Sequence, residues 1–173
     1  VLNLKNKSHS VTAQIVVPAG GAEGVIVAQG GNMGGWSLYA RAGKLKYCYN
    51  FVGVQHSYAE SSSPLPPGEH QVRMEFIYDG GGLGRGGTAT LYVDGKRVGD
   101  GKVPATEILL FSADEGCDVG RDTGAPVSPD YGSRGNEFTG QVKGVQLAIA
   151  EDAVSLDHLV SPEEAVRIAM ARQ

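Results

Sequence analysis

Two neighbouring segments decide the fold of this chain, Gln71-Val-Arg-Met-Glu-Phe-Ile-Tyr78 and Gly87-Thr-Ala-Thr-Leu-Tyr-Val-Asp-Gly-Lys-Arg-Val98. In both segments apolar and polar side chains alternate, and a period of two is that of a strand with one buried face. Asp94-Gly95 stands between two strand-like runs and predicts a β-hairpin, because both central residues of a type I′ turn need positive φ. The region therefore predicts adjacent antiparallel strands.

The same alternation recurs on both sides of this region. Strand-like runs cover 11–17, 24–29, 36–40, 45–51, 52–58 and 138–149, and Gly-rich turns separate them. The phase of the last run slips by one residue at Lys143-Gly144, as a β-bulge would make it do. The Ser- and Pro-rich segment 61–68 predicts a break between strands. About ten short strands without crossover helices predict an all-β fold, a jelly-roll sandwich of two antiparallel sheets.

Length and charge limit the domain organisation and the partners. The chain has 173 residues and a formal net charge of -4. We expect one sandwich domain over residues 1–150 and a tail over 151–173, with a short helix at about 161–172, because Ser161-Pro-Glu-Glu164 begins with an N-cap and Pro at the first helical position. Nucleic acid is disfavoured as a partner, because its binding normally needs a basic face. No apolar run approaches the ~20 residues that span a bilayer.

Several motifs of enzymes are incomplete here. Gly82-Leu-Gly-Arg-Gly-Gly87 matches G-x-G-x-x-G, but a strand follows it where a dinucleotide site needs a helix, so a hairpin loop is the better interpretation. Cys117-Asp-Val-Gly-Arg121 departs from the sulfatase signature C-x-P-x-R at Val119. Cys48 and Cys117 allow either a disulfide or two separate thiols.

Two sets of residues are candidates for binding. Asp114, Asp118 and Asp122 lie in a Gly- and Pro-rich loop and predict a structural calcium site, since Ca²⁺ takes carboxylate and carbonyl oxygens from flexible loops. The alternative is a solvated acidic loop with Asx turns. For a sugar or sulfate ligand the candidates are two aromatic residues, which could equally fill a core, and two loop arginines: Trp36, Tyr39, Arg121 and Arg134.

Several strings, in order along the chain, resemble known families. Gly34-Gly-Trp-Ser-Leu-Tyr39, Gly43-Lys-Leu-Lys-Tyr47 and Gly68-Glu-His-Gln-Val-Arg-Met-Glu-Phe76 are similar to segments of laminin-G-like and concanavalin A-like jelly rolls. More narrowly, four further strings resemble the C-terminal region of long bacterial arylsulfatases. They are Tyr78-Asp-Gly-Gly-Gly-Leu-Gly84, Phe111-Ser-Ala-Asp-Glu115, Asp118-Val-Gly-Arg-Asp-Thr-Gly124 and Tyr131-Gly-Ser-Arg-Gly-Asn136. The resemblance covers most of residues 3–150 and extends into the tail.

This resemblance implies a non-catalytic domain that follows the catalytic domain of a sulfate-ester hydrolase in the bacterial cytoplasm or periplasm. It implies that upstream domain as a partner, a sulfated or sugar ligand, and contacts within a homo-oligomer. Because the C-x-P-x-R motif is incomplete, no catalytic residue is assigned, and the chain by itself is expected to be neither an enzyme nor dependent on a cofactor. Two alternatives stay open: a lectin-like carbohydrate-binding module, and a glycoside hydrolase with two carboxyl groups in one cleft.

Overall fold

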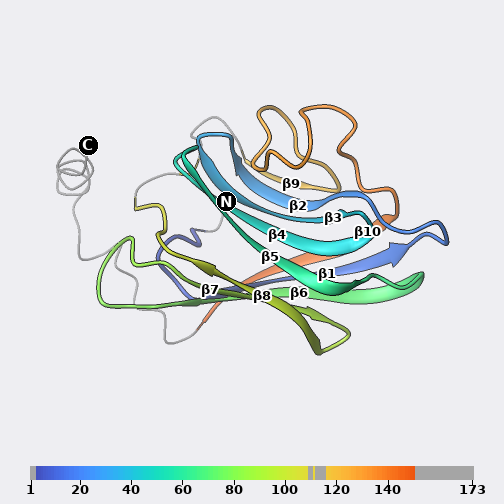
Figure 1. Cartoon of the computed structure of the whole chain (residues 1–173), viewed down its shortest axis with the longest axis horizontal. Helices are drawn as coiled ribbons and strands as arrows, with labels where there is room; N and C mark the ends of the chain where they lie inside the picture. The colour runs from blue at the N-terminus through green and yellow to red at the C-terminus, as the bar shows by residue number, and fades with distance from the viewer. Residues whose placement is uncertain (1–2, 109–110, 112–115, 151–173) are drawn as a thin grey trace.

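The fold is an antiparallel sandwich of two five-stranded sheets, seen in a computed structural model that describes residues 3–108, 111 and 116–150 (Figure 1). Its strands are β1 (His9–Val17), β2 (Gly24–Gly31), β3 (Gly34–Arg41), β4 (Lys44–Phe51), β5 (Gln55–Pro64), β6 (Gly68–Tyr78), β7 (Gly87–Val93), β8 (Lys96–Val103), β9 (Cys117–Val119) and β10 (Gln141–Ile149). The first sheet has the order β10-β1-β6-β7-β8, and the second has the order β5-β4-β3-β2-β9. The predicted all-β jelly roll is confirmed.

The main core lies between the two sheets and uses the predicted alternation. Val72, Met74 and Phe76 of β6 are buried, whereas the residues between them face outward. Tyr49 of β4 stacks on Phe76 with 6.4 Å between the ring centroids, so an aromatic pair joins the two sheets. Burying these alternate side chains removes apolar surface from water, which is the main stabilising contribution to such a fold.

Two local predictions in the first sheet are confirmed. Asp94 and Gly95 have φ values of 48° and 79° in the turn between β7 and β8. The register between β1 and β10 shifts between Gln14 and Ile15, where Gln14 pairs with Gly144 and Ile15 pairs with Val142. Lys143 is thus the extra residue of a β-bulge.

The prediction of a break at 61–68 was wrong in its first half. β5 runs on to Pro64, which pairs with Lys44 of β4 across a register shift. β5 is an edge strand of the second sheet, and an edge is where a strand accepts proline, because one side of its backbone needs no partner. Leu65, just after the strand, is buried and ties this end to the core.

The two sheets approach each other closely along β5 and β8. A Cβ built on Gly99 would overlap the carbonyl oxygen of Glu60, and one built on Gly101 would overlap that of Tyr58. Neither glycine has a positive φ, so the need for glycine here comes from space alone. Backbone therefore packs directly on backbone at this edge of the sandwich.

Three further predictions concern the tail, the cysteines and the membrane. The predicted helix at about 161–172 lies outside the described residues. Cys48 is a buried free thiol and Cys117 a half-buried one, so they form no disulfide. In the described part of the chain, no helix is long and apolar enough to cross a membrane.

Candidate functional site

The outer face of the second sheet is covered by a loop, the segment 120–136. Beneath this cover lies a small second core, made by Val25, Ala28, Tyr39, Cys48 and Val127, with Tyr58 and Tyr131 packed against it. Tyr39 of β3 meets Tyr131 of the cover edge to face, with 5.2 Å between the ring centroids. One face of the sandwich on which a ligand could lie is therefore occupied by the chain itself.

Three polar residues of the cover hold it closed. Asp122 accepts hydrogen bonds from the Val127 backbone N–H at 2.9 Å and from the Tyr131 hydroxyl at 2.6 Å. The side chain of Asn136 accepts from the Asp122 N–H and donates to its carbonyl oxygen. Burial raises the pKa of Asp122, and the hydrogen bonds from Tyr131 and Val127 offset part of that rise. These groups stabilise the loop and are not free for catalysis.

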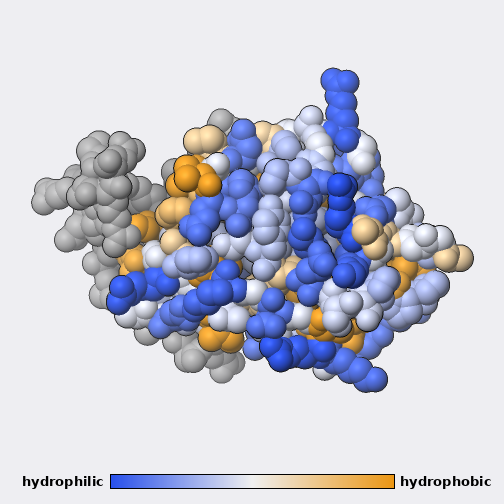
Figure 2. Space-filling model, viewed as in Figure 1, coloured by the Kyte–Doolittle hydropathy of each residue, from blue (hydrophilic) through white to orange (hydrophobic). Residues whose placement is uncertain are grey.

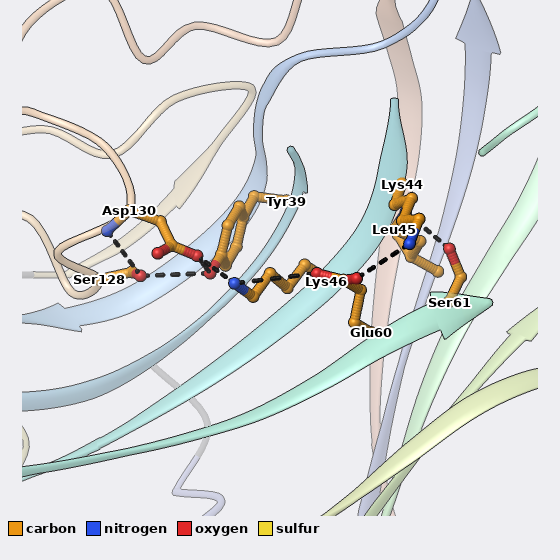
Figure 3. A network of polar contacts seen from close by, with 8 residues as sticks. All are labelled: Tyr39, Lys44, Leu45, Lys46, Glu60, Ser61, Ser128 and Asp130. Atoms are coloured by element: carbon orange, nitrogen blue, oxygen red, sulfur yellow. Dashed lines mark hydrogen bonds and ion pairs between the residues drawn. The ribbon is translucent and has the colours of Figure 1, made fainter. Parts of the chain in front are cut away.

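A second polar network fixes the cover to β3 and β4 (Figure 3). The Tyr39 hydroxyl donates to Asp130 Oδ2 at 2.5 Å and lies 3.2 Å from Ser128 Oγ. Lys46 Nζ is 2.6 Å from the same carboxylate oxygen. Burial raises the pKa of Asp130, but the hydrogen bonds from Lys46 and Tyr39 outweigh it, and the net pKa is lowered. Asp130 is therefore ionised and paired in the folded protein at neutral pH.

The aromatic and arginine candidates lie in three different places. Trp36 has no exposed surface and donates from Nε1 to Gln29 Oε1 at 3.0 Å inside the main core. Tyr39 is 1% exposed beneath the cover. Neither ring presents a face to solvent. A sugar could therefore not stack on Trp36 or Tyr39 in this arrangement, and both rings fill a core, the other interpretation that the sequence allowed. Arg121 and Arg134 are exposed on the cover, where they could meet a ligand.

The calcium candidates do not form a cluster in the described part of the chain. Asp118 accepts from the backbone and the hydroxyl of Thr123, and Asp122 holds the cover closed. Asp114 lies outside the described residues, so the calcium site stays a prediction. Among the residues that the structure describes, no three His, Cys, Asp or Glu side chains could together hold a metal ion.

The two cysteines have the wrong environment for a nucleophile. Burial raises the pKa of Cys48 to about 12, and burial together with nearby Asp118 raises the pKa of Cys117. A thiol attacks as the thiolate, which a raised pKa makes scarce at neutral pH. The near-match at Cys117–Arg121 therefore has an incomplete motif, and its thiol is not activated as a thiolate.

The sequence analysis missed a hollow of about 280 Å³ over β10, β1 and β6 on the first sheet. It is lined by Ser8, His9, Ser10, Arg73, Glu75, Phe76, Ile77, Ala148, Ile149 and Ala150. Serine and alanine side chains on β1 and β10 are short, whereas β6 contributes the long Arg73, Glu75 and Ile77. Arg73 Nη2 lies 3.2 Å from Glu75 Oε2. The signal in the sequence was Ile77, an apolar residue at a position where β6 is otherwise polar.

Comparison with solved structures supports the architecture. The CBM40 of the Ruminococcus gnavus IT-sialidase superposes with a TM-score of 0.57 at 12% identity, over 90% of this chain and 82% of that one. Domains LG4-5 of the mouse laminin alpha1 chain superpose with a TM-score of 0.54 at 19% identity, over 87% of this chain and 38% of that one. The fold is a laminin-G-like jelly roll. No protein-family model matches the sequence, and no curated protein matches it.

The resemblance to arylsulfatases has no counterpart in these comparisons. At such low sequence identities the structural likeness establishes the laminin-G-like jelly roll and nothing finer.

Proposed function

We propose that this laminin-G-like jelly roll is a non-catalytic accessory domain of an arylsulfatase-type sulfate-ester hydrolase. The observation that carries the proposal is the role of the strings that resemble arylsulfatase C-terminal regions. The strings 118–124 and 131–136 meet in one structural unit, in which Asp122, Tyr131 and Asn136 close the cover over the second sheet. The residues that resemble arylsulfatase C-terminal regions thus maintain the fold. This is expected of an accessory domain that has the architecture of those regions in common with them and carries out no reaction itself.

The chemistry of the described residues favours an accessory role over a catalytic one. Sulfate-ester hydrolysis by the implied parent needs a modified Cys or Ser in a complete C-x-P-x-R motif, and Val119 interrupts that motif here. Cys117 itself sits on the short edge strand β9 with its pKa raised by burial. The domain would therefore act by supporting the catalytic domain, by shaping access of substrate to it, or by contacts between copies.

We expect the 173-residue chain to fold and to show no hydrolysis of a chromogenic aryl sulfate above background. Cys117→Ala is expected to leave that background unchanged, because Cys117 is no nucleophile in this environment. A spectrophotometric assay of the released phenol measures both proteins under the same conditions. Turnover by the unmodified chain that disappears in Cys117→Ala would contradict the proposal.

The parent can be tested through its coding sequence. We expect the natural reading frame upstream of Val1 to encode a complete C-x-P-x-R motif within a catalytic domain. An upstream sequence without such a domain would refute the sulfatase assignment and leave the jelly roll itself untouched.

A second candidate function is binding of a carbohydrate, favoured by the hollow on the first sheet. Arg73 and Glu75 place donors and acceptors side by side, and Ile77 adds an apolar wall, a combination that suits the hydroxyls and apolar face of one sugar ring. The CBM40 of similar fold has been solved bound to alpha2,6 sialyllactose, with a TM-score of 0.56 and 13% identity to this chain. Glu75 is the single acid among the residues that line the hollow. A glycoside hydrolase needs two carboxyl groups in one cleft, so the hollow does not provide such a site.

For this candidate we expect heat on titration of the chain with a sialylated or sulfated oligosaccharide. Arg73→Ala is expected to weaken the binding at least tenfold, because it removes the charged donor of the hollow. Arg97→Ala is the matched control, since Arg97 lies on β8 outside the hollow and pairs with Asp100 on its own strand. Isothermal calorimetry that detects no heat with either sugar, or an equal effect of both variants, would reject the candidate.

A further inference from the structure

A second hollow lies on the same three strands as the first. Its volume is about 290 Å³, against about 280 Å³ for the hollow described above. Both lie over β10, β1 and β6, which are neighbours in the first sheet (Figure 1). The second hollow is lined by Gln14, Ile15, Glu69, His70, Lys143 and Gly144. We call the first the Ser10 hollow and the second the Gln14 hollow, after a residue that β1 contributes to each.

The strand register places both hollows on the outer face of the sheet and fixes the distance between them. Ser10 pairs with Glu75 of β6 and with Ala148 of β10. Gln14 pairs with Gly144 of β10 further along the same strands. Residues two and four positions apart in a strand point to one face, so Ser10 and Gln14 both face outward, away from the buried residues between them. Four residue steps separate the two, about 13 Å along β1. Because hydrogen-bonded strands hold both ends, this spacing is set before any ligand binds.

The surface between the two hollows is polar and has short side chains on β1 and β10. Thr12 of β1 lies midway between the hollows, and Gln146 of β10 pairs with it. Gly144 has no side chain, and a Cβ built there would meet no heavy atom within 4 Å. On the other side of β1 the long Arg73 of β6 pairs with Thr12. The hollows and the strip between them thus form a shelf along β1, with the long side chains of β6 as its wall.

An ion pair lies at each hollow of the shelf. Arg73 and Glu75 pair at the Ser10 hollow, with 3.2 Å between Nη2 and Oε2. Lys143 and Glu69 pair at the Gln14 hollow. Because Lys143 is on β10 and Glu69 is on β6, this second pair reaches across β1. A guanidinium, an ammonium and a carboxylate each have more hydrogen-bonding positions than one ion pair uses, so both pairs can also contact the hydroxyl groups of a ligand.

We infer that the shelf binds a linear oligosaccharide that lies along β1 from one hollow to the other, an inference that rests on carbohydrate binding, the second candidate function. A span of about 13 Å suits a chain of about three sugar rings. Hydroxyl, amide and paired charged groups along the shelf match the hydroxyls of such a chain. An apolar partner would find little to pack on, because Ile77 is the one large apolar side chain that is exposed among the described residues lining the two hollows. On the face that Figure 2 displays, apolar surface is likewise broken into small patches between hydrophilic side chains.

Calorimetry with two sugars of different length tests this inference on the 173-residue chain. The probes are alpha2,6 sialyllactose, which is a trisaccharide, and free sialic acid, which is a single ring. The trisaccharide is expected to bind at least tenfold more tightly, because it reaches both hollows and the single ring reaches one. Arg73→Ala is expected to weaken the binding of both sugars, since Arg73 lines the Ser10 hollow, which either sugar occupies.

Gly144→Leu blocks the Gln14 hollow and leaves the Ser10 hollow open. The new side chain starts in open space and the φ of Gly144 is not positive, so the variant is expected to unfold at the same urea concentration as the unmodified chain or at a higher one. It is expected to bind the trisaccharide at least tenfold more weakly and sialic acid as before. Gly132→Leu is the matched control. Gly132 is exposed on the cover of the other sheet, its φ is not positive, and its Cβ would lie 3.7 Å from the Arg134 carbonyl oxygen, an ordinary contact.

Equal affinities for the two sugars would overturn the inference, and so would a Gly144→Leu variant that binds the trisaccharide as tightly as the unmodified chain does. Either result confines the ligand to the Ser10 hollow and leaves carbohydrate binding itself intact. One sugar bound per two chains would place a second copy of the chain on the shelf and would overturn the inference as well. No heat with either sugar rejects carbohydrate binding, and the inference falls with it.

Discussion

Gly101→Ala is expected to lower the free energy of unfolding by about 3 kcal/mol, at the upper end of the usual cost of overpacking. The new methyl group would overlap the carbonyl oxygen of Tyr58 on β5. That oxygen belongs to the backbone of a paired strand and cannot swing aside as a flexible side chain could. The overlap can be relieved only by moving β8 away from β5, which opens the core between the two sheets. Urea unfolding followed by tryptophan fluorescence measures the change, because Trp36 reports on that core.

Gly144→Ala is the matched control for this prediction. Gly144 also lies in a strand of the first sheet, its φ is not positive, and a Cβ built on it meets no heavy atom within 4 Å. Alanine there is expected to change stability by less than about 1 kcal/mol, in the direction of greater stability, because glycine is the more flexible residue in the unfolded chain. Similar small effects at both positions would mean that β5 and β8 are not packed backbone on backbone.

The features of the fold that could be predicted are those that short segments of the sequence determine. The alternation of Val72, Met74 and Phe76, the Asp94-Gly95 turn and the bulge at Lys143 all depend on neighbours in sequence or on one hydrogen-bonded partner. Each could be predicted, because a strand's period and a turn's φ values are properties of short segments.

The features that escaped prediction depend on residues far apart in sequence. Tyr39 looks like an outward-facing aromatic residue until Ser128 and Asp130, some ninety positions away, cover it. Likewise, Gly99 and Gly101 resemble turn glycines, and their role depends on β5. The hollow over β1, β6 and β10 arises only when three strands with side chains of different length are placed side by side. No period within a single strand carries that information.

Acidification from pH 6.5 to pH 4 is expected to lower the free energy of unfolding by up to about 3 kcal/mol, because of His9. Burial lowers the pKa of His9 from 6.5 to about 4, against a smaller opposite effect of its hydrogen bond to the Lys7 carbonyl oxygen. Between those two values the unfolded chain binds a proton that the folded chain does not. Stability is therefore fully present above pH 6.5 and declines as the pH falls. His9→Leu is expected to remove the contribution of His9 to the pH dependence, which a series of urea titrations at different pH measures.

Glu107 has the opposite effect on the pH dependence of stability over part of the range between pH 6.5 and pH 4. Burial raises its pKa to about 6, while the Val52 N–H and Lys5 oppose the rise. The folded carboxyl group takes up its proton between about pH 6 and 4.5, before the unfolded one does, and stabilises the fold by up to about 2 kcal/mol as the pH falls. Glu107→Gln should thus steepen the acid loss caused by His9, whereas His9→Leu should leave a protein that is more stable at pH 5 than at pH 7. Parallel pH profiles for both variants and the unmodified chain would contradict the assignment of the two groups, and with it the view that Glu107 is buried behind the turn that carries Val52.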